Sequence, residues 1–219
     1  MDRRGRGASG DAPDYELGRE FEDVAAVVDS IAQASGEAVA VYGHSYGGNC
    51  AWGAVTLTRN IAALVLYEGW PPVRSELIDF PPEAEERLGA LVAAGEREAA
   101  LELFMREVVK VPEEQVAALR AQPAWSARVA VAHTIAREIR ALLAHPFDRQ
   151  DAAKISVPVL VLTGAESPAE IRDDPEAVVA ALPEAQLIVI EGQEHLADVL
   201  APDVLAGHIL TFLRERCRA

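Results

Sequence analysis

The chain has 219 residues, of which 50% are hydrophobic and 25% are charged, a composition typical of a globular protein with one sizeable core. Its formal net charge of −15 argues against partners such as nucleic acids and anionic membrane surfaces. Only two cysteines occur, Cys50 and Cys217, without a CxxC spacing, so neither a disulfide framework nor a zinc site is indicated. No apolar run reaches transmembrane length, and the basic start lacks the apolar segment of a signal peptide, so we expect a cytoplasmic protein.

The first predicted elements are a helix, a strand, a second helix and a second strand. Apolar residues recur at three- and four-residue steps over residues 15–34, which predicts an amphipathic helix that Gly36 closes. A strand over residues 38–42, a small-residue helix over 48–58 and a strand over 61–67 follow.

The rest of the chain divides into a helical stretch and a second strand-rich part. From Pro71 to His145 the sequence has helical periodicity and no strand-like run, which predicts three or four inserted helices. Further elements are expected at the end of the chain: strands over 157–163 and 185–190, and helices over 175–182 and 203–216. This alternation predicts an α/β fold, a mostly parallel sheet with helices on both faces. The predicted domains are a core of residues 1–70 and 146–219 and a helical cap of residues 71–145.

The sequence Gly43-His44-Ser45-Tyr46-Gly47 directly follows the first predicted strand and precedes a helix. In that context a Gly-x-Ser-x-Gly turn is typical of a nucleophile elbow, in which the serine sits at a strained backbone position. An ordinary Gly-rich turn is the alternative. As an elbow, the turn would project Ser45 into a cleft above a helix N-terminus, and the backbone N–H of Tyr46 would face a developing oxyanion.

After each predicted strand comes a residue whose side chain can take part in catalysis: Ser45, Glu68, Glu166 and His195. Ligands of open parallel sheets bind beyond the carboxyl ends of the strands, so these side chains are candidates for one site. A serine hydroxyl needs a base, and the base needs an acid that fixes its tautomer. His195, in the loop after the last strand, is the predicted base. His44, beside the serine, is expected to pack or to form hydrogen bonds.

With these motifs in this order, the chain resembles the α/β-hydrolase superfamily over nearly its whole length. The opening Asp2-Arg3-Arg4-Gly5-Arg6-Gly7-Ala8-Ser9 resembles an Asp-x-Arg-Gly-x-Gly-x-Ser segment of these enzymes, with a nucleic-acid-binding Arg/Gly tract as the alternative. The resemblance implies a Ser-His-acid triad without metal or cofactor.

The acid of this triad has two candidates. Many relatives carry Asp in a Gly-x-x-Asp pattern after the penultimate strand, where this chain has Ser167, one residue past Glu166. Another branch uses Glu at the end of the strand that follows the elbow, and Glu68 matches that place. We therefore expect Glu68 to be the acid, with Glu166 as the alternative.

Relatives begin with further strands and a His-Gly loop that donates a second oxyanion N–H. The sequence given contains neither, which predicts an incomplete sheet, and self-association through its edge or through the cap.

The expected function is a serine hydrolase of the esterase or lactonase type, acting through an acyl-enzyme on a small apolar ester, thioester or lactone. The alternative is a catalytically impaired or inactive hydrolase-like binding or interaction module, which would result from loss of the N-terminal strands and the oxyanion loop. Aromatic and sulfur side chains in or beside the cap are candidates for lining the substrate pocket, with ordinary packing as the alternative for each: Trp70, Phe80, Phe104, Met105, Trp125 and Phe147.

Overall fold

The computed structural model describes residues 1–12, 14–74, 82–169 and 171–216. Contacts divide the chain into two compact units. The sheet unit comprises Met1 and the described residues of 16–75 and 142–219, and the helical unit comprises the described residues of 2–15 and 76–141. Phe80 and Cys217 lie outside the described residues.

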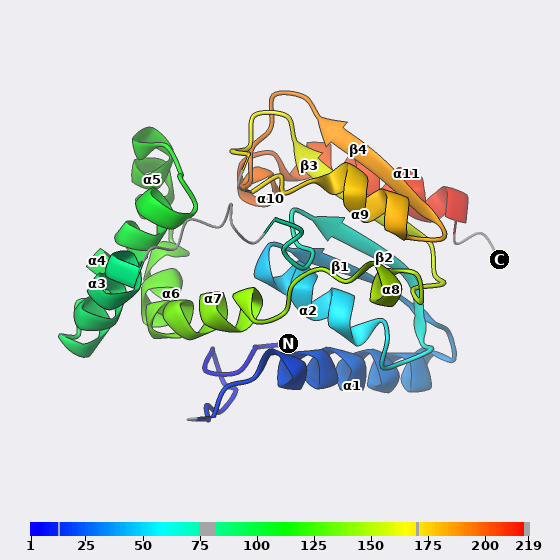
Figure 1. Cartoon of the computed structure of the whole chain (residues 1–219), viewed down its shortest axis with the longest axis horizontal. Coiled ribbons are helices and arrows are strands. Elements are labelled where there is room, and N and C mark those ends of the chain that lie inside the picture. Colours follow the sequence, from blue (N-terminus) through cyan, green and yellow to red (C-terminus); the bar gives the residue numbers. More distant parts are fainter. Residues whose placement is uncertain (13, 75–81, 170, 217–219) are drawn as a thin grey trace. The chain divides into compact units, whose positions relative to one another are not determined.

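The sheet unit contains a four-stranded parallel sheet with strand order β1-β2-β3-β4 (Figure 1). The strands are β1 (Val39–His44), β2 (Ile61–Tyr67), β3 (Val159–Gly164) and β4 (Ala185–Ile190). In the register, His44 lies opposite Tyr67, Tyr67 opposite Leu162, and Leu162 opposite Ile188. The carboxyl ends of all four strands therefore meet at one edge of the sheet, as the fold class predicted.

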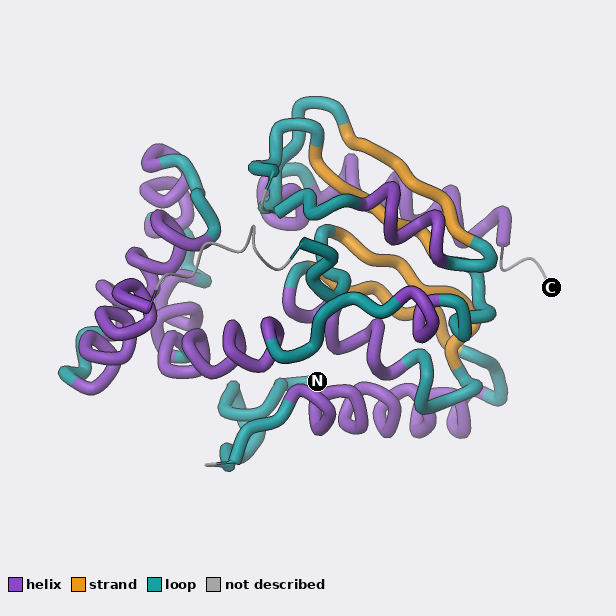
Figure 2. The backbone as a smooth tube through the Cα atoms, viewed as in Figure 1, coloured by secondary structure: helices purple, strands orange, loops and turns teal. Residues whose placement is uncertain are grey.

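Helices cover both faces of this sheet (Figure 2). One face packs against α1 (Leu17–Ser35), α2 (Tyr46–Ala54), α8 (Arg149–Ala152) and α9 (Pro175–Ala181), and the other against α10 (Ala197–Leu200) and α11 (Pro202–Arg216). Because the two central strands are buried on both sides, they are apolar at almost every position rather than at alternate ones. The predicted α/β class is confirmed.

The predicted helices and strands of the sheet unit are present, with shifted ends. The first helix ends at Ser35, and its C-cap is Gly36, which has a left-handed φ of 79° and donates its backbone N–H to the carbonyl of Ala32. The helix after the elbow begins at Tyr46, two residues earlier than expected, because Ser45 is its N-cap. The buried Cys50 lies in this helix and is part of the core.

The described part of the helical unit contains helices and no strand. Five α-helices occur rather than the predicted three or four: α3 (Pro82–Ala93), α4 (Arg97–Leu103), α5 (Glu113–Arg120), α6 (Trp125–Ala130) and α7 (Ile135–Leu143). A π-helical turn, η2 (Phe104–Val108), and a 3₁₀ turn, η3 (Ala132–Thr134), connect some of them. Proline does not continue a helix, and Pro112 and Pro123 lie between helices that the periodicity alone did not separate.

The opening segment belongs to the helical unit, whereas the predicted division assigned it to the core with residues 1–70. Arg6 Nη2 donates to both carboxylate oxygens of the buried Glu138 on α7, at 2.9 and 2.8 Å, and Arg3 Nη2 donates to one of them at 3.0 Å. These guanidinium groups are thus paired within the protein. That pairing disfavours a nucleic-acid-binding tract.

Among the described residues, no helix combines the length and the apolar character that crossing a membrane requires.

Candidate active site

Ser45 lies in the turn between β1 and α2 with φ 52° and ψ −128°, a backbone conformation that non-glycine residues rarely adopt. Backbone hydrogen bonds hold it there: its N–H donates to the Tyr67 carbonyl at 3.0 Å, and its own carbonyl accepts from Gly48 N at 2.9 Å. Strain of this kind persists only where surrounding contacts fix it, as in a nucleophile elbow.

The turn also needs residues without side chains. A Cβ at Gly43 would lie 2.5 Å from the Cα of Gly48, and a Cβ at Gly48 would lie 2.2 Å from the carbonyl oxygen of Gly69. The start of α2 therefore passes in backbone contact with the end of β1 and with the loop after β2. This close approach positions Ser45 at the carboxyl edge of the sheet.

The structure brings Ser45, His195 and Glu68 into one hydrogen-bonded chain. Ser45 Oγ lies 3.1 Å from His195 Nε2, and His195 Nδ1 lies 2.7 Å from Glu68 Oε2. His195 and Glu68 are 8% and 6% exposed, so the pair is shielded from water. A carboxylate only accepts, so His195 Nδ1 carries the hydrogen and Nε2 presents its lone pair to the serine hydroxyl.

Glu68 forms hydrogen bonds with the end of β3 as well as with His195. It follows the last residue of β2 with a left-handed φ of 44°, and its Oε1 accepts hydrogen bonds from Thr163 Oγ1 and Gly164 N, both at 2.8 Å. Burial alone would raise the pKa of Glu68, but the hydrogen bonds from His195 and Gly164 contribute to holding it below its ordinary value. The carboxylate is thus ionised at neutral pH.

Burial has the opposite consequence for His195. Removal from water disfavours the imidazolium and lowers the pKa of His195, against the hydrogen bond to Glu68, which raises it. The net shift is downward, so the ring is neutral at neutral pH. A neutral imidazole beside a serine hydroxyl can act as a general base.

Residues 1–208 match the model of the alpha/beta hydrolase family. The chain belongs to this family. An alpha/beta hydrolase from Sphaerobacter thermophilus DSM 20745 is 36% identical, with a TM-score of 0.79, over 97% of this chain and 80% of that one.

Two more distant structures share the fold. The enol-lactonase from Burkholderia xenovorans LB400 is 20% identical, with a TM-score of 0.71, over 97% of this chain and 79% of its own. A thermophilic esterase from Thermogutta terrifontis is 22% identical, with a TM-score of 0.69, over 97% and 77%. No curated protein sequence matches the chain.

Glu166, the alternative acid, is not brought to His195. It lies in the turn after β3, where its backbone N–H donates to the Gln193 carbonyl at 3.0 Å and its side chain is exposed. Ser167, at the Gly-x-x-Asp position of many alpha/beta hydrolases, is buried, and its Oγ would lie 2.9 Å from a Cβ at Gly164.

The predicted oxyanion donor, Tyr46, is the first residue of α2, directly after Ser45. Its N–H belongs to the first turn, where the positive end of the helix dipole lies. This is the place that an oxyanion formed at Ser45 would need. Its role stays a prediction.

The aromatic residues predicted to line a pocket have packing contacts within their own units. In the sheet unit, the Trp70 indole N–H donates to the Asp173 carbonyl at 2.9 Å, and Phe147 lies against Trp52 with ring centroids 5.7 Å apart. In the helical unit, Trp125 Nε1 donates to Glu98 Oε1 at 2.8 Å, Met105 is buried, and Phe104 is partly buried in η2. Contact with a substrate stays a prediction for each of them.

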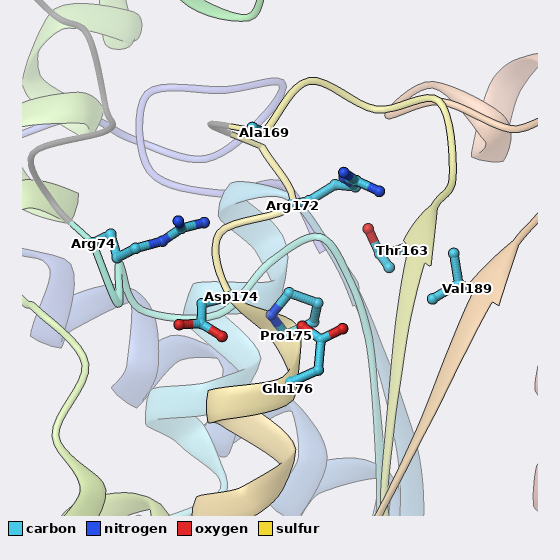
Figure 3. Close-up of a pocket in the computed structure, with 8 residues that line it drawn as sticks. All are labelled: Arg74, Thr163, Ala169, Arg172, Asp174, Pro175, Glu176 and Val189. Carbon is cyan, nitrogen blue, oxygen red and sulfur yellow. The ribbon is translucent and has the colours of Figure 1, made fainter.

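Within the sheet unit, a small cavity lies beside Thr163, the hydrogen-bond donor to Glu68. Thr163, which donates to Glu68, lines it together with polar side chains of the loop before α9 and its first turn, including Arg172, Asp174 and Glu176 (Figure 3). Its volume is about 330 Å³. In the part of the chain that the structure describes, no group of three or more His, Cys, Asp or Glu side chains could hold a metal ion.

Sequence reasoning missed the hydrogen bond from Thr163 to Glu68 and the contacts that hold the His195 loop. Thr163 is the one polar side chain in the interior of an otherwise apolar strand, which could have indicated it. The His44 ring forms a hydrogen bond with the loop that carries His195, and packing or hydrogen bonding was the role expected for His44.

Proposed function

We propose that the protein is a serine hydrolase that cleaves a small, largely apolar ester, thioester or lactone through an acyl-enzyme. The observation that carries the proposal is the continuous chain from Ser45 Oγ through His195 to Glu68, at 3.1 and 2.7 Å. An elbow serine, a buried neutral imidazole and an ionised carboxylate form the arrangement that acyl transfer requires.

In the first step His195 Nε2 accepts the hydroxyl proton as Ser45 Oγ attacks the carbonyl carbon of the substrate. The C–O π bond opens to an oxyanion, which the Tyr46 N–H and the N-terminal end of α2 stabilise. Glu68 stabilises the imidazolium through the 2.7 Å hydrogen bond at Nδ1.

Collapse of the tetrahedral intermediate expels the leaving group, an alcohol or a thiol, which takes its proton from His195 Nε2. In a lactone the leaving oxygen stays attached to the acyl group. Water then repeats the sequence: His195 takes its proton, the hydroxide oxygen attacks the acyl carbon, and the proton returns to Ser45 as the acid departs.

The substrate class is inferred from proteins that share the fold. The fold is shared with an esterase and an enol-lactonase, which favours an ester or a lactone as substrate. An acyl-ester hydrolysis assay therefore suits the first test.

The test is hydrolysis of p-nitrophenyl butyrate by the wild-type protein, by Ser45→Ala and by the matched control Ser126→Ala. Ser126 lies on an exposed position of α6. We expect Ser45→Ala to lower kcat by at least about 1,000-fold without changing the circular dichroism spectrum, because only the attacking oxygen is removed. Ser126→Ala should retain full activity. More than a few per cent residual activity in Ser45→Ala would remove Ser45 from the mechanism, and an inactive wild-type protein would favour a binding module.

A further inference from the structure

His44, the residue before the serine, contacts the backbone of the loop that carries His195. His44 Nε2 lies 2.8 Å from the His195 carbonyl oxygen, and Nδ1 lies 3.3 Å from Asp198 Oδ2 at the start of α10. A carbonyl oxygen only accepts, so Nε2 carries a hydrogen and donates it. This hydrogen bond links the end of β1 to the segment that follows β4.

A second side chain holds the same loop from the neighbouring strand. Tyr67, at the end of β2, is fully buried, and its hydroxyl donates to the Glu194 carbonyl. The His44 ring stacks on Tyr67, with centroids 5.3 Å apart and planes 24° from parallel. Two stacked rings therefore bind two consecutive carbonyl groups, those of Glu194 and His195.

These contacts matter because His195 lies in a loop rather than in a helix or strand. Its imidazole must stay within hydrogen-bond reach of Ser45 on one side and Glu68 on the other. A displacement of about 1 Å can cost on the order of 100-fold in rate, so the backbone of this residue needs to be fixed.

We propose that His44 is a positioning residue, which holds His195 in reach of Ser45 by donating a hydrogen bond to the His195 carbonyl. The inference rests on the proposed function for its kinetic consequence, but its structural consequence does not depend on any activity. Tyr67 performs the same task at the Glu194 carbonyl.

Two substitutions at His44 separate the hydrogen bond from packing. His44→Phe keeps a ring that can stack on Tyr67 but removes the donor. His44→Gln places an amide N–H near the position of Nε2 and restores the donor without the ring. His208→Phe, on the partly exposed face of α11, is the matched control for replacing a histidine by phenylalanine.

In the ester assay we expect His44→Phe to lower kcat by about 10- to 100-fold with KM within about twofold of wild type. His44→Gln should recover most of this loss, and His208→Phe should match wild type. Tyr67→Phe, which keeps the buried ring and loses the hydroxyl, should lower kcat in the same direction; it serves as the second variant if His44→Phe does not fold.

A readout without turnover distinguishes this inference from the proposed function. The proton on His195 Nδ1 is buried and bonded to Glu68, so it should give a low-field proton resonance in water. We expect that resonance in wild type, His44→Gln and His208→Phe, and its loss in His44→Phe and Tyr67→Phe. An inactive wild-type protein with this pattern would contradict only the hydrolase proposal. A retained resonance with wild-type kcat in His44→Phe, or equal losses in His44→Phe and His44→Gln, would overturn the positioning role.

Discussion

Replacement of Glu68 by glutamine removes the charge of the candidate acid and changes almost nothing in its size. The structure predicts how the amide would turn. The position of Oε1 receives two donors, Thr163 Oγ1 and Gly164 N, so an oxygen must remain there. The amide nitrogen is then forced into the position of Oε2, 2.7 Å from His195 Nδ1.

An amide nitrogen donates, so in Glu68→Gln the His195 Nδ1 must accept and its hydrogen moves to Nε2. That nitrogen then points an N–H at Ser45 and cannot take the hydroxyl proton. The wrong tautomer costs about 10,000-fold in kcat in a serine protease triad, which corresponds to about 5.5 kcal/mol of transition-state stabilisation. We expect a loss of this order, with the free energy of unfolding changed by at most about 2 kcal/mol.

The assay is kcat/KM on p-nitrophenyl butyrate for purified wild type, Glu68→Gln and the control Glu166→Gln. Glu166 is exposed and was the other candidate acid, so its variant should keep wild-type activity. More than a tenth of wild-type kcat/KM in Glu68→Gln would refute the change of tautomer at His195. A severe loss in Glu166→Gln would move the acid to the loop after β3.

Two further predictions concern the elbow and the pH profile. In Gly48→Ala the new Cβ would lie 2.2 Å from a backbone carbonyl oxygen, so urea denaturation should show a free energy of unfolding lower by about 1–3 kcal/mol. In the control Gly47→Ala the new Cβ meets nothing within 4 Å, and the free energy of unfolding should stay within about 0.5 kcal/mol of wild type. Equal stabilities of the two variants would contradict the close approach. Burial lowers the pKa of His195, and the reaction needs the neutral ring. We therefore expect kcat/KM to stay constant as the pH falls to the ordinary histidine pKa of about 6.5 and to decline only below it. A midpoint of the pH profile above pH 7 would contradict His195 as the base.

Local sequence predicted the elbow and the strands because their causes are local. The two central strands, β2 and β3, are buried and apolar at almost every position, and Gly43, Ser45 and Gly48 fix the turn within six residues. The choice between Glu68 and Glu166 depended on the fold. Both follow strands, and only the pairing of β2 with β3 places Glu68 beside Thr163 and Gly164.

Contacts between distant parts of the chain were the least predictable. Arg6 is paired with Glu138, 132 residues later, and no periodicity or motif in either segment indicates this partner. Likewise, the place of His195 after the last strand predicts its role as the base, but the sequence does not specify that His44 binds its carbonyl. Such tertiary contacts come from the way the elements pack, which sequence patterns alone describe poorly.

The central claim, that Ser45 is a nucleophile activated by His195, is tested most directly by covalent labelling with a fluorophosphonate and mass spectrometry. Trypsin should release residues 20–59 as one peptide, which carries Ser30, Ser35 and Ser45, so fragmentation identifies the modified serine. We predict a single phosphonyl adduct on Ser45 in the wild-type protein, and none in His195→Ala under the same conditions. An unlabelled wild-type protein, or an adduct on another serine, would contradict the account.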